Sequence, residues 1–125
     1  MKKIHVSEIT RNIKEMCIEA NYYLSADMKS VLQKAVQEEE SPLGGQILTQ
    51  LQENLKIAGE KQIPICQDTG MAVVFISVGQ DVHIEGGSLE EAIHEGVRQG
   101  YTKGYLRKSV VKDPFYRENA CRDSL

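Results

Sequence analysis

Midway along the chain stands Ile63-Pro64-Ile65-Cys66-Gln67-Asp68-Thr69-Gly70, and a nearly unbroken apolar run, residues 71–78, follows it. Proline has no backbone N–H, so Pro64 argues against an interior strand position and indicates a short extended segment. Residues 71–78 are apolar enough and long enough for a buried strand. We therefore expect the chain to change here from helices to a sheet, with residues 66–70 forming a polar turn.

Before this stretch, apolar residues recur at the spacing of amphipathic helices. The three stripes are Ile9, Ile13, Met16, Cys17, Ala20 and Leu24; Met28, Val31, Leu32, Ala35 and Val36; and Leu43, Ile47, Leu48, Leu51, Leu55 and Ala58. Ser7, Ser25 and Ser41 precede these stripes and are expected N-caps, and Pro42 suits a first helical position. The sequence therefore predicts a layer of three helices, in which Cys17 is a buried small apolar side chain.

After residues 71–78 the sequence predicts a second strand and a fourth helix. Residues 79–81 turn the chain into a short apolar segment, residues 82–84. Ser88 and Glu91 form a capping box at the start of a helix that extends to about Lys103. The apolar face of this helix is unusually small, so another backbone can approach it closely. It consists of Leu89, Ala92, Ile93, Gly96, Val97 and Gly100.

These elements together predict an α+β fold. We expect an amino-terminal helical layer of about three helices, then a short sheet and the fourth helix, with the turn at residues 66–70 at one rim. Residues 104–114 are expected to form a loop, with a short extended piece at residues 110–111.

The composition excludes several classes of function. Of the 125 residues, 41% are hydrophobic, and the formal net charge is −3, so the chain can bury a core but lacks the basic surface that nucleic-acid binding needs. No run approaches the roughly 20 apolar residues that span a bilayer, and the amino terminus does not resemble a signal peptide. Three widely spaced cysteines, Cys17, Cys66 and Cys121, fit reduced thiols and a cytoplasmic location.

The polar turn at residues 66–70 is the best candidate for chemistry. Cys66 can bind iron or attack an electrophile, the Gln67 amide can donate and accept hydrogen bonds, and Asp68 can accept or exchange protons. An ordinary Asp-Thr-Gly turn beside a buried thiol is the alternative. Arg107 could present a planar fork to a carboxylate, although an arginine beside a lysine is more often simply solvated.

The histidines leave one further alternative open. His83 on the predicted second strand and His94 on the predicted fourth helix have no carboxylate or thiolate at ligand spacing, which favours a structural role. A Cys66 nucleophile with a histidine base would instead require His83 or His94 within hydrogen-bond distance of the sulfur.

Two motifs resemble those of the iron–sulfur hydro-lyases, the family of the class I fumarate hydratases and L-tartrate dehydratases. The first motif is Ile63-Pro64-Ile65-Cys66-Gln67-Asp68-Thr69-Gly70-Met71. The second is Tyr105-Leu106-Arg107-Lys108-Ser109-Val110-Val111, followed by Asp113-Pro114 and Arg117. The resemblance covers residues 1–119, the amino-terminal part of the alpha domain, whereas residues 120–125 form a divergent tail.

The resemblance implies a 4Fe-4S cluster held by three cysteine thiolates, with Cys66 as the first ligand. It also implies that Gln67 and Asp68 line a C4 dicarboxylate substrate and that Arg107 binds one of its carboxylates. The implied reaction is the reversible hydration of fumarate to malate. The implied partner is the beta subunit of an alpha/beta hetero-oligomer, and no general base is assigned to this chain.

In the family the sequence continues well beyond the position of Asn119, so we expect this chain to be an incomplete fragment of a larger domain. The two later cluster cysteines are absent, and Cys121 does not replace one of them. We therefore expect the chain alone to hold no stable cluster and to lack hydratase activity. Two alternatives remain: a fragment of an L-tartrate dehydratase alpha subunit, or a non-catalytic domain that docks a partner subunit.

Overall fold

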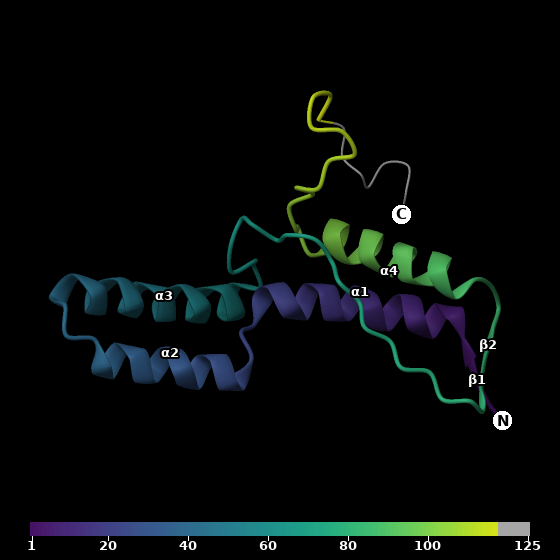
Figure 1. Ribbon diagram of the computed structural model, residues 1–125, viewed down its shortest axis with the longest axis horizontal. Coiled ribbons are helices and arrows are strands. Elements are labelled where there is room, and N and C mark those ends of the chain that lie inside the picture. The colour runs from purple at the N-terminus through teal and green to yellow at the C-terminus, as the bar shows by residue number, and fades with distance from the viewer. Residues whose placement is uncertain (118–125) are drawn as a thin grey trace.

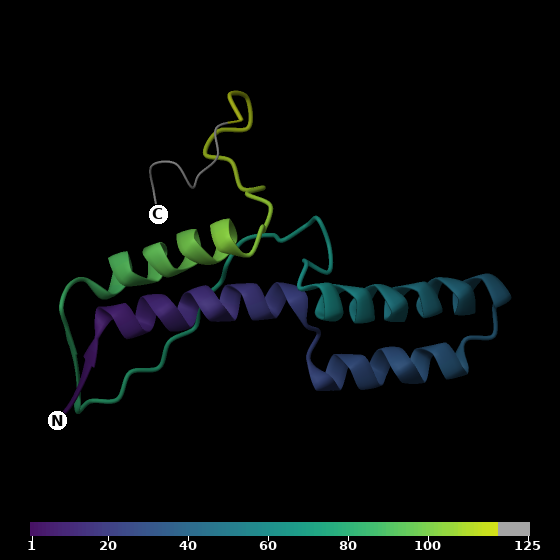
Figure 2. The same ribbon diagram turned by 180° about the vertical axis from the view of Figure 1, so that it is seen from behind.

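The computed structural model describes residues 1–117, which form four helices and two short strands. Their order is β1 (Lys2–His5), α1 (Val6–Tyr22), α2 (Ala26–Glu38), α3 (Pro42–Lys61), β2 (Val82–Glu85) and α4 (Leu89–Lys103). Figures 1 and 2 show α1 and α4 lying side by side with the strands at one end, and α2 and α3 forming a hairpin beyond the other end of α1. The predicted α+β fold is confirmed. The predicted tail at residues 120–125, with Cys121, lies outside the described residues.

The predicted N-cap residues are found at the helix starts, except at the start of α1. Ser41 caps α3 by accepting a hydrogen bond from Gly44 N at 3.3 Å, and Ser88 caps α4 by accepting one from Glu91 N at 3.4 Å. The predicted cap at Ser7 is wrong, because α1 already begins at Val6 and His5 is its N-cap. His5 Nδ1 accepts the hydrogen bond from Ser7 N at 3.2 Å, so a ring nitrogen does here what a serine hydroxyl usually does.

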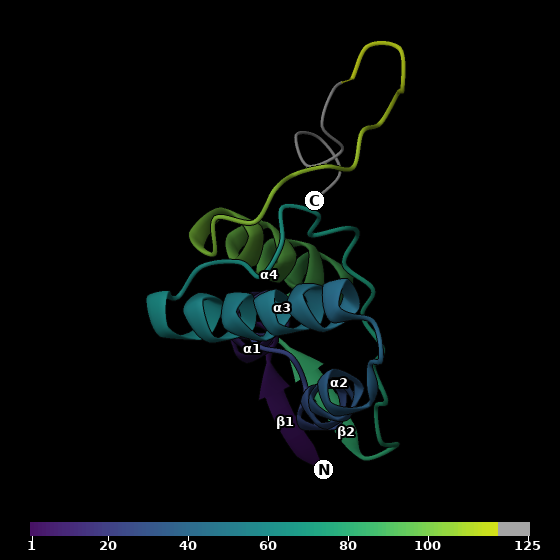
Figure 3. The same ribbon diagram turned by 90° about the vertical axis from the view of Figure 1, so that its left-hand side faces the viewer.

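The sheet is parallel and brings the amino terminus beside residues far along the chain. β1 pairs with β2 from Lys2 opposite Val82 to His5 opposite Glu85, and Figure 3 shows the two strands side by side. Each strand leads into a helix, β1 into α1 and β2 into α4. This places the first turns of α1 and α4 next to each other and sets the direction in which both helices run.

The strand predicted at residues 71–78 is wrong. Within residues 1–117 the sheet has only two strands, and residues 71–78 are an extended segment that belongs to neither. A strand is stabilised by its neighbour's backbone, and β2 takes its hydrogen bonds from β1, so an apolar run without a pairing strand stays irregular. Its side chains are largely exposed, with Met71 at 71% and Phe75 at 93%.

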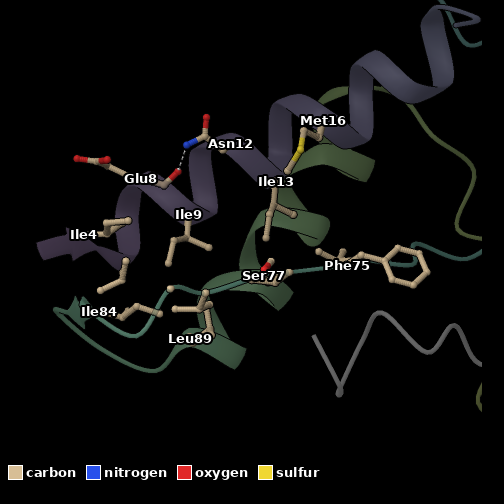
Figure 4. A pocket seen from close by; sticks show the side chains of 15 residues that line it. Ile4, Glu8, Ile9, Asn12, Ile13, Met16, Phe75, Ser77, Ile84 and Leu89 are labelled. Atoms are coloured by element: carbon tan, nitrogen blue, oxygen red, sulfur yellow. Dashed lines mark hydrogen bonds between the residues drawn. The ribbon is translucent and has the colours of Figure 1, made fainter. Parts of the chain in front are cut away.

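Part of this apolar segment lies over a small groove. The groove has a volume of about 320 Å³, and α1, both strands and residues 74–79 line it. Figure 4 shows Ile9 and Ile13 of α1 pointing into it, whereas Phe75 points away from it. The segment therefore covers one side of α1 loosely and adds little to the core.

The core lies where α1 packs against α4. It consists of Ile13, Tyr22, Val97, Tyr101 and Leu106, with Cys17 packed against it. The predicted close approach to the small face of α4 is confirmed, because a Cβ placed at Gly100 would lie 2.7 Å from Cys17 Cβ and 3.0 Å from Lys14 O. Cys17 was predicted to be buried, but it is only half-buried where it packs against the core, and desolvation by that partial burial raises the pKa of its thiol.

No helix among residues 1–117 has both the length and the apolar character needed to cross a membrane.

Candidate functional site

The first half of the site is the thiol loop, residues 63–70, which begins directly after α3. Gln62 ends the helix in the left-handed conformation at φ 54° and turns the chain out of the helical direction. Ile65 N donates to Asn21 O at 2.8 Å, and Asn54 Nδ2 donates to Ile65 O at 2.9 Å. The backbone just before Cys66 is therefore held from α1 and from α3 at once.

The polar residues of the thiol loop form a tight turn. Asp68 N donates to Cys66 Sγ at 3.4 Å, and Gly70 N donates to Asp68 Oδ1 at 3.3 Å. Gly70 has φ +59°, a conformation that an L-residue rarely adopts. The turn expected from the Asp-Thr-Gly sequence is therefore present, but the thiol beside it is exposed rather than buried. Cys66, Gln67 and Asp68 all face solvent and are accessible to a ligand.

The second half of the site is the arginine loop, residues 104–109, which begins directly after α4. Leu106 is 4% exposed in the core, and its N–H donates to Tyr101 O at 3.0 Å. The buried Tyr22 hydroxyl donates to Gly104 O at 2.9 Å. Arg107 follows immediately; its side chain is exposed, and hydrogen bonds of the neighbouring residues hold the backbone on its amino-terminal side.

The two loops meet although 38 residues separate their contact points. Thr69 Oγ1 donates to Arg107 O at 2.6 Å. Both loops line one open hollow of about 1120 Å³, with Cys66, Gln67, Asp68 and Arg107 on its wall. The four residues that the sequence suggested as a site are therefore brought together, and a thiol, an amide, a carboxylate and a guanidinium share one opening.

Sequence reasoning missed three residues of this hollow. Thr69 was seen only as a turn residue, yet its hydroxyl joins the two loops. Asn54 lines the hollow from α3. It is one of many polar residues on an amphipathic helix, so the sequence does not single it out as a site residue. Tyr105 also lines it and has φ 54°, which no spacing pattern reveals.

Neither His83 nor His94 is among the described residues that line this hollow. Both lie on other elements, β2 and α4, so the arrangement gives a Cys66 nucleophile no histidine base in this part of the chain. Nor do three or more His, Cys, Asp or Glu residues gather anywhere in residues 1–117 as a metal site. An exposed thiolate is a suitable ligand for iron, and Cys66 fits the role of one ligand among several.

Comparison with known proteins shows which proteins this chain is similar to. A Methanocaldococcus jannaschii protein named as L(+)-tartrate dehydratase subunit alpha is 38% identical over 113 residues, 90% of this chain. A Geobacillus stearothermophilus protein named as class I fumarate hydratase is 29% identical over 92% of this chain. The anaerobic class I fumarate hydratase of Escherichia coli is 35% identical over 62% of it. All three names are those of hydro-lyases.

The family is narrower than that class. The sequence pattern of the family described as fumarate hydratase (Fumerase) matches residues 10–124, and the chain belongs to this family. The resemblance to the iron–sulfur hydro-lyases that the two motifs suggested is thereby confirmed. The chain spans 39%, 22% and 12% of the lengths of the three relatives, so it corresponds to one part of each.

Proposed function

We propose that this chain supplies part of the active site of a complete hydro-lyase that reversibly hydrates fumarate to malate. The observation that supports this best is the shared hollow, because Cys66, Asp68 and Arg107 come from two loops and open onto one space. Membership of the fumarate hydratase family supports the same conclusion. Fumarate carries two carboxylates, and a cationic fork on the wall suits such a substrate.

In this proposal each side chain has a separate task. Arg107 binds one substrate carboxylate with paired N–H donors, and Gln67 and Asp68 orient the rest of the dicarboxylate through their hydrogen-bonding groups. Cys66 is one of three thiolate ligands of a 4Fe-4S cluster. When bound, that cluster supplies a Lewis acid that polarises the substrate oxygen atoms.

The proposal also requires groups from outside this chain. Hydration places a hydroxyl on one alkene carbon and a proton on the other, so a base must exchange that proton, and we assign none among these residues. Cys66 is the single thiol among residues 1–117 that lines the hollow, so in this proposal the other two cluster ligands come from elsewhere. We propose that a beta subunit and the remainder of the alpha subunit supply them in an alpha/beta hetero-oligomer; the Methanocaldococcus jannaschii relative is itself named as a subunit alpha.

Dehydration of L-tartrate is the second candidate function. It is favoured by the relative that carries that name at 38% identity. The experiment that tests the proposal is purification of the complete protein without oxygen, followed by assays with fumarate, malate and L-tartrate. Turnover of fumarate and malate in preference to tartrate is expected. A preference for tartrate would favour the second candidate, and activity with neither would contradict both.

Replacing Arg107 by lysine in the complete protein is expected to raise the KM for the dicarboxylate about 10- to 100-fold, with a smaller change in kcat. Lysine keeps the charge but cannot make the paired N–H contacts of the guanidinium, so about one charge-assisted hydrogen bond is lost. Steady-state kinetics with fumarate measure the effect. Lys108→Arg is the control, because that neighbour does not line the hollow among the described residues. An unchanged KM in Arg107→Lys would show that the guanidinium does not bind substrate.

The chain alone is expected to bind no stoichiometric cluster and to show no hydratase activity. Cys66 is the single thiol that lines the hollow in residues 1–117, and one thiolate does not hold a cluster that needs three. Anaerobic reconstitution with iron and sulfide, followed by assays for both elements, tests this expectation. A full cluster on the isolated chain would refute it.

A docking domain without catalytic function is a competing proposal, and the exposed apolar segment at residues 71–78 favours it. In this case the complete protein would bind its partner subunit normally but would keep full activity when Cys66 and Arg107 are replaced. In our proposal the same replacements leave subunit assembly intact and remove activity, so sedimentation analysis combined with kinetics separates the two.

A further inference from the structure

A hydrogen bond from a side-chain hydroxyl to a backbone carbonyl joins the thiol loop to the arginine loop. Thr69 is half-buried, and its Oγ1 donates to Arg107 O at 2.6 Å. The same carbonyl accepts Ser109 N at 3.0 Å and Ser109 Oγ at 3.3 Å. The bonds from Ser109 are local to the arginine loop. The bond from Thr69 is the one that ties this carbonyl to the thiol loop.

Thr69 is itself tied to the core. The Tyr101 hydroxyl donates to Thr69 O at 3.2 Å and lies 3.4 Å from Gly70 O. Tyr101 is 7% exposed and belongs to the core between α1 and α4. Because a core side chain holds the backbone of Thr69, the threonine hydroxyl has a defined position from which to hold a second loop.

The position of the Arg107 guanidinium depends on its backbone. Within residues 1–117 the Arg107 side chain takes part in no ion pair. It is exposed to solvent. Its backbone is held on one side by the buried Leu106 and on the other by the bond from Thr69.

We propose that Thr69 is a positioning residue, which sets the distance between the arginine fork and the thiol loop through the Arg107 carbonyl. This inference rests on the proposed function, because the distance matters only if one substrate contacts both loops. A substrate must reach the guanidinium with one carboxylate and the centre at Cys66 with its reacting end. A misplacement of about 1 Å between such groups can cost on the order of a hundredfold in rate.

The test uses Thr69→Val and Thr69→Ser in the complete protein. Valine keeps the branched shape but has no hydroxyl, and serine keeps the hydroxyl. Thr69→Val is expected to raise KM for fumarate about five- to tenfold, as the loss of one hydrogen bond allows, with unchanged iron content. Thr69→Ser is expected to restore KM to within about twofold of the parent value.

A matched control and a double variant show whether Thr69 acts through Arg107. Thr49 also donates its hydroxyl to a backbone carbonyl, Gly45 O at 2.8 Å, but it lies on α3 and outside the hollow, so Thr49→Val is expected to leave KM unchanged. In an Arg107→Lys background, Thr69→Val is expected to add little, because residues that act as one unit are not additive. A parent-like KM in Thr69→Val, or full additivity in the double variant, would overturn the proposal.

A second readout does not depend on activity. Amide hydrogen exchange at Leu106 and Ser109 reports the arginine loop, and Thr69→Val is expected to accelerate it several-fold while Thr49→Val does not. Unchanged exchange in Thr69→Val would contradict the proposed link. If the complete protein hydrates no dicarboxylate, the proposed function fails, and the exchange experiment still decides whether Thr69 holds the arginine loop.

Discussion

Replacing Cys66 by alanine in the complete protein is expected to lower kcat for fumarate hydration on the order of a thousandfold or more. A Lewis acid contributes several kcal/mol of transition-state stabilisation, and each 1.36 kcal/mol is about tenfold in rate. Cys66 is exposed on the wall of the hollow, and its replacement removes no core contact. The loss is therefore expected without a loss of folding, which circular dichroism checks.

Cys17→Ala is the matched control for this experiment. Cys17 lies on α1, half-buried against the core, and burial raises the pKa of its thiol, as is usual for a structural cysteine. Its replacement is expected to lower stability slightly and to leave activity close to that of the parent. Equal activity losses in the two variants would contradict a specific role for Cys66.

Replacing Gly100 by alanine is expected to destabilise the chain by about 1–3 kcal/mol, because the new methyl group overpacks the contact between α1 and α4. The added Cβ would lie 2.7 Å from Cys17 Cβ and 3.0 Å from the backbone oxygen of Lys14, so the helices must separate. A Cβ at Gly96 would meet Ile13 Cβ and Thr10 O at 2.8 Å. Gly96→Ala with Gly100→Ala is therefore expected to be worse than either change alone.

Gly45→Ala is the matched control, since it is the same substitution inside a helix. A Cβ at Gly45 meets no atom within 4 Å, so alanine should stabilise α3 by about 0.5–1 kcal/mol through its helix propensity. Urea unfolding followed by circular dichroism compares the Gly96→Ala, Gly100→Ala and Gly45→Ala variants and the double variant. If Gly100→Ala proves as stable as Gly45→Ala, the close packing of α4 on α1 is wrong.

Local sequence signals explain the helices well. Ser41 with Pro42 and Ser88 with Glu91 mark helix starts that the structure confirms, because capping bonds join residues two or three positions apart. The small face of α4 was also predictable, since Gly96 and Gly100 are four residues apart and occupy the same side of the helix.

The sheet was predicted less well because its pairing is not local. β1 is only the four residues Lys2–His5, with a single half-buried position, and its partner lies 80 residues away. Residues 71–78 show the reverse case, in which an apolar run has strand composition but no strand beside it. Composition indicates that a segment can form a strand, whereas the presence of a neighbouring strand depends on the whole fold.

The candidate site divides in the same way. Cys66, Gln67, Asp68 and Arg107 were chosen from two motifs, and the structure places all four on one hollow. Their roles as cluster ligand and substrate contacts remain predictions. The bond that joins the loops could not be predicted, because Thr69 binds a backbone carbonyl, which every residue has and which leaves no mark in the sequence.

Selenium X-ray absorption tests the ligand role of Cys66 most directly. The complete protein would carry Cys66→selenocysteine and would be purified without oxygen, so that the selenium atom reports its own neighbours. An iron atom in the first shell of selenium is the predicted result. A first shell containing carbon alone, in a protein that still holds its iron, would show that residue 66 does not bind the cluster.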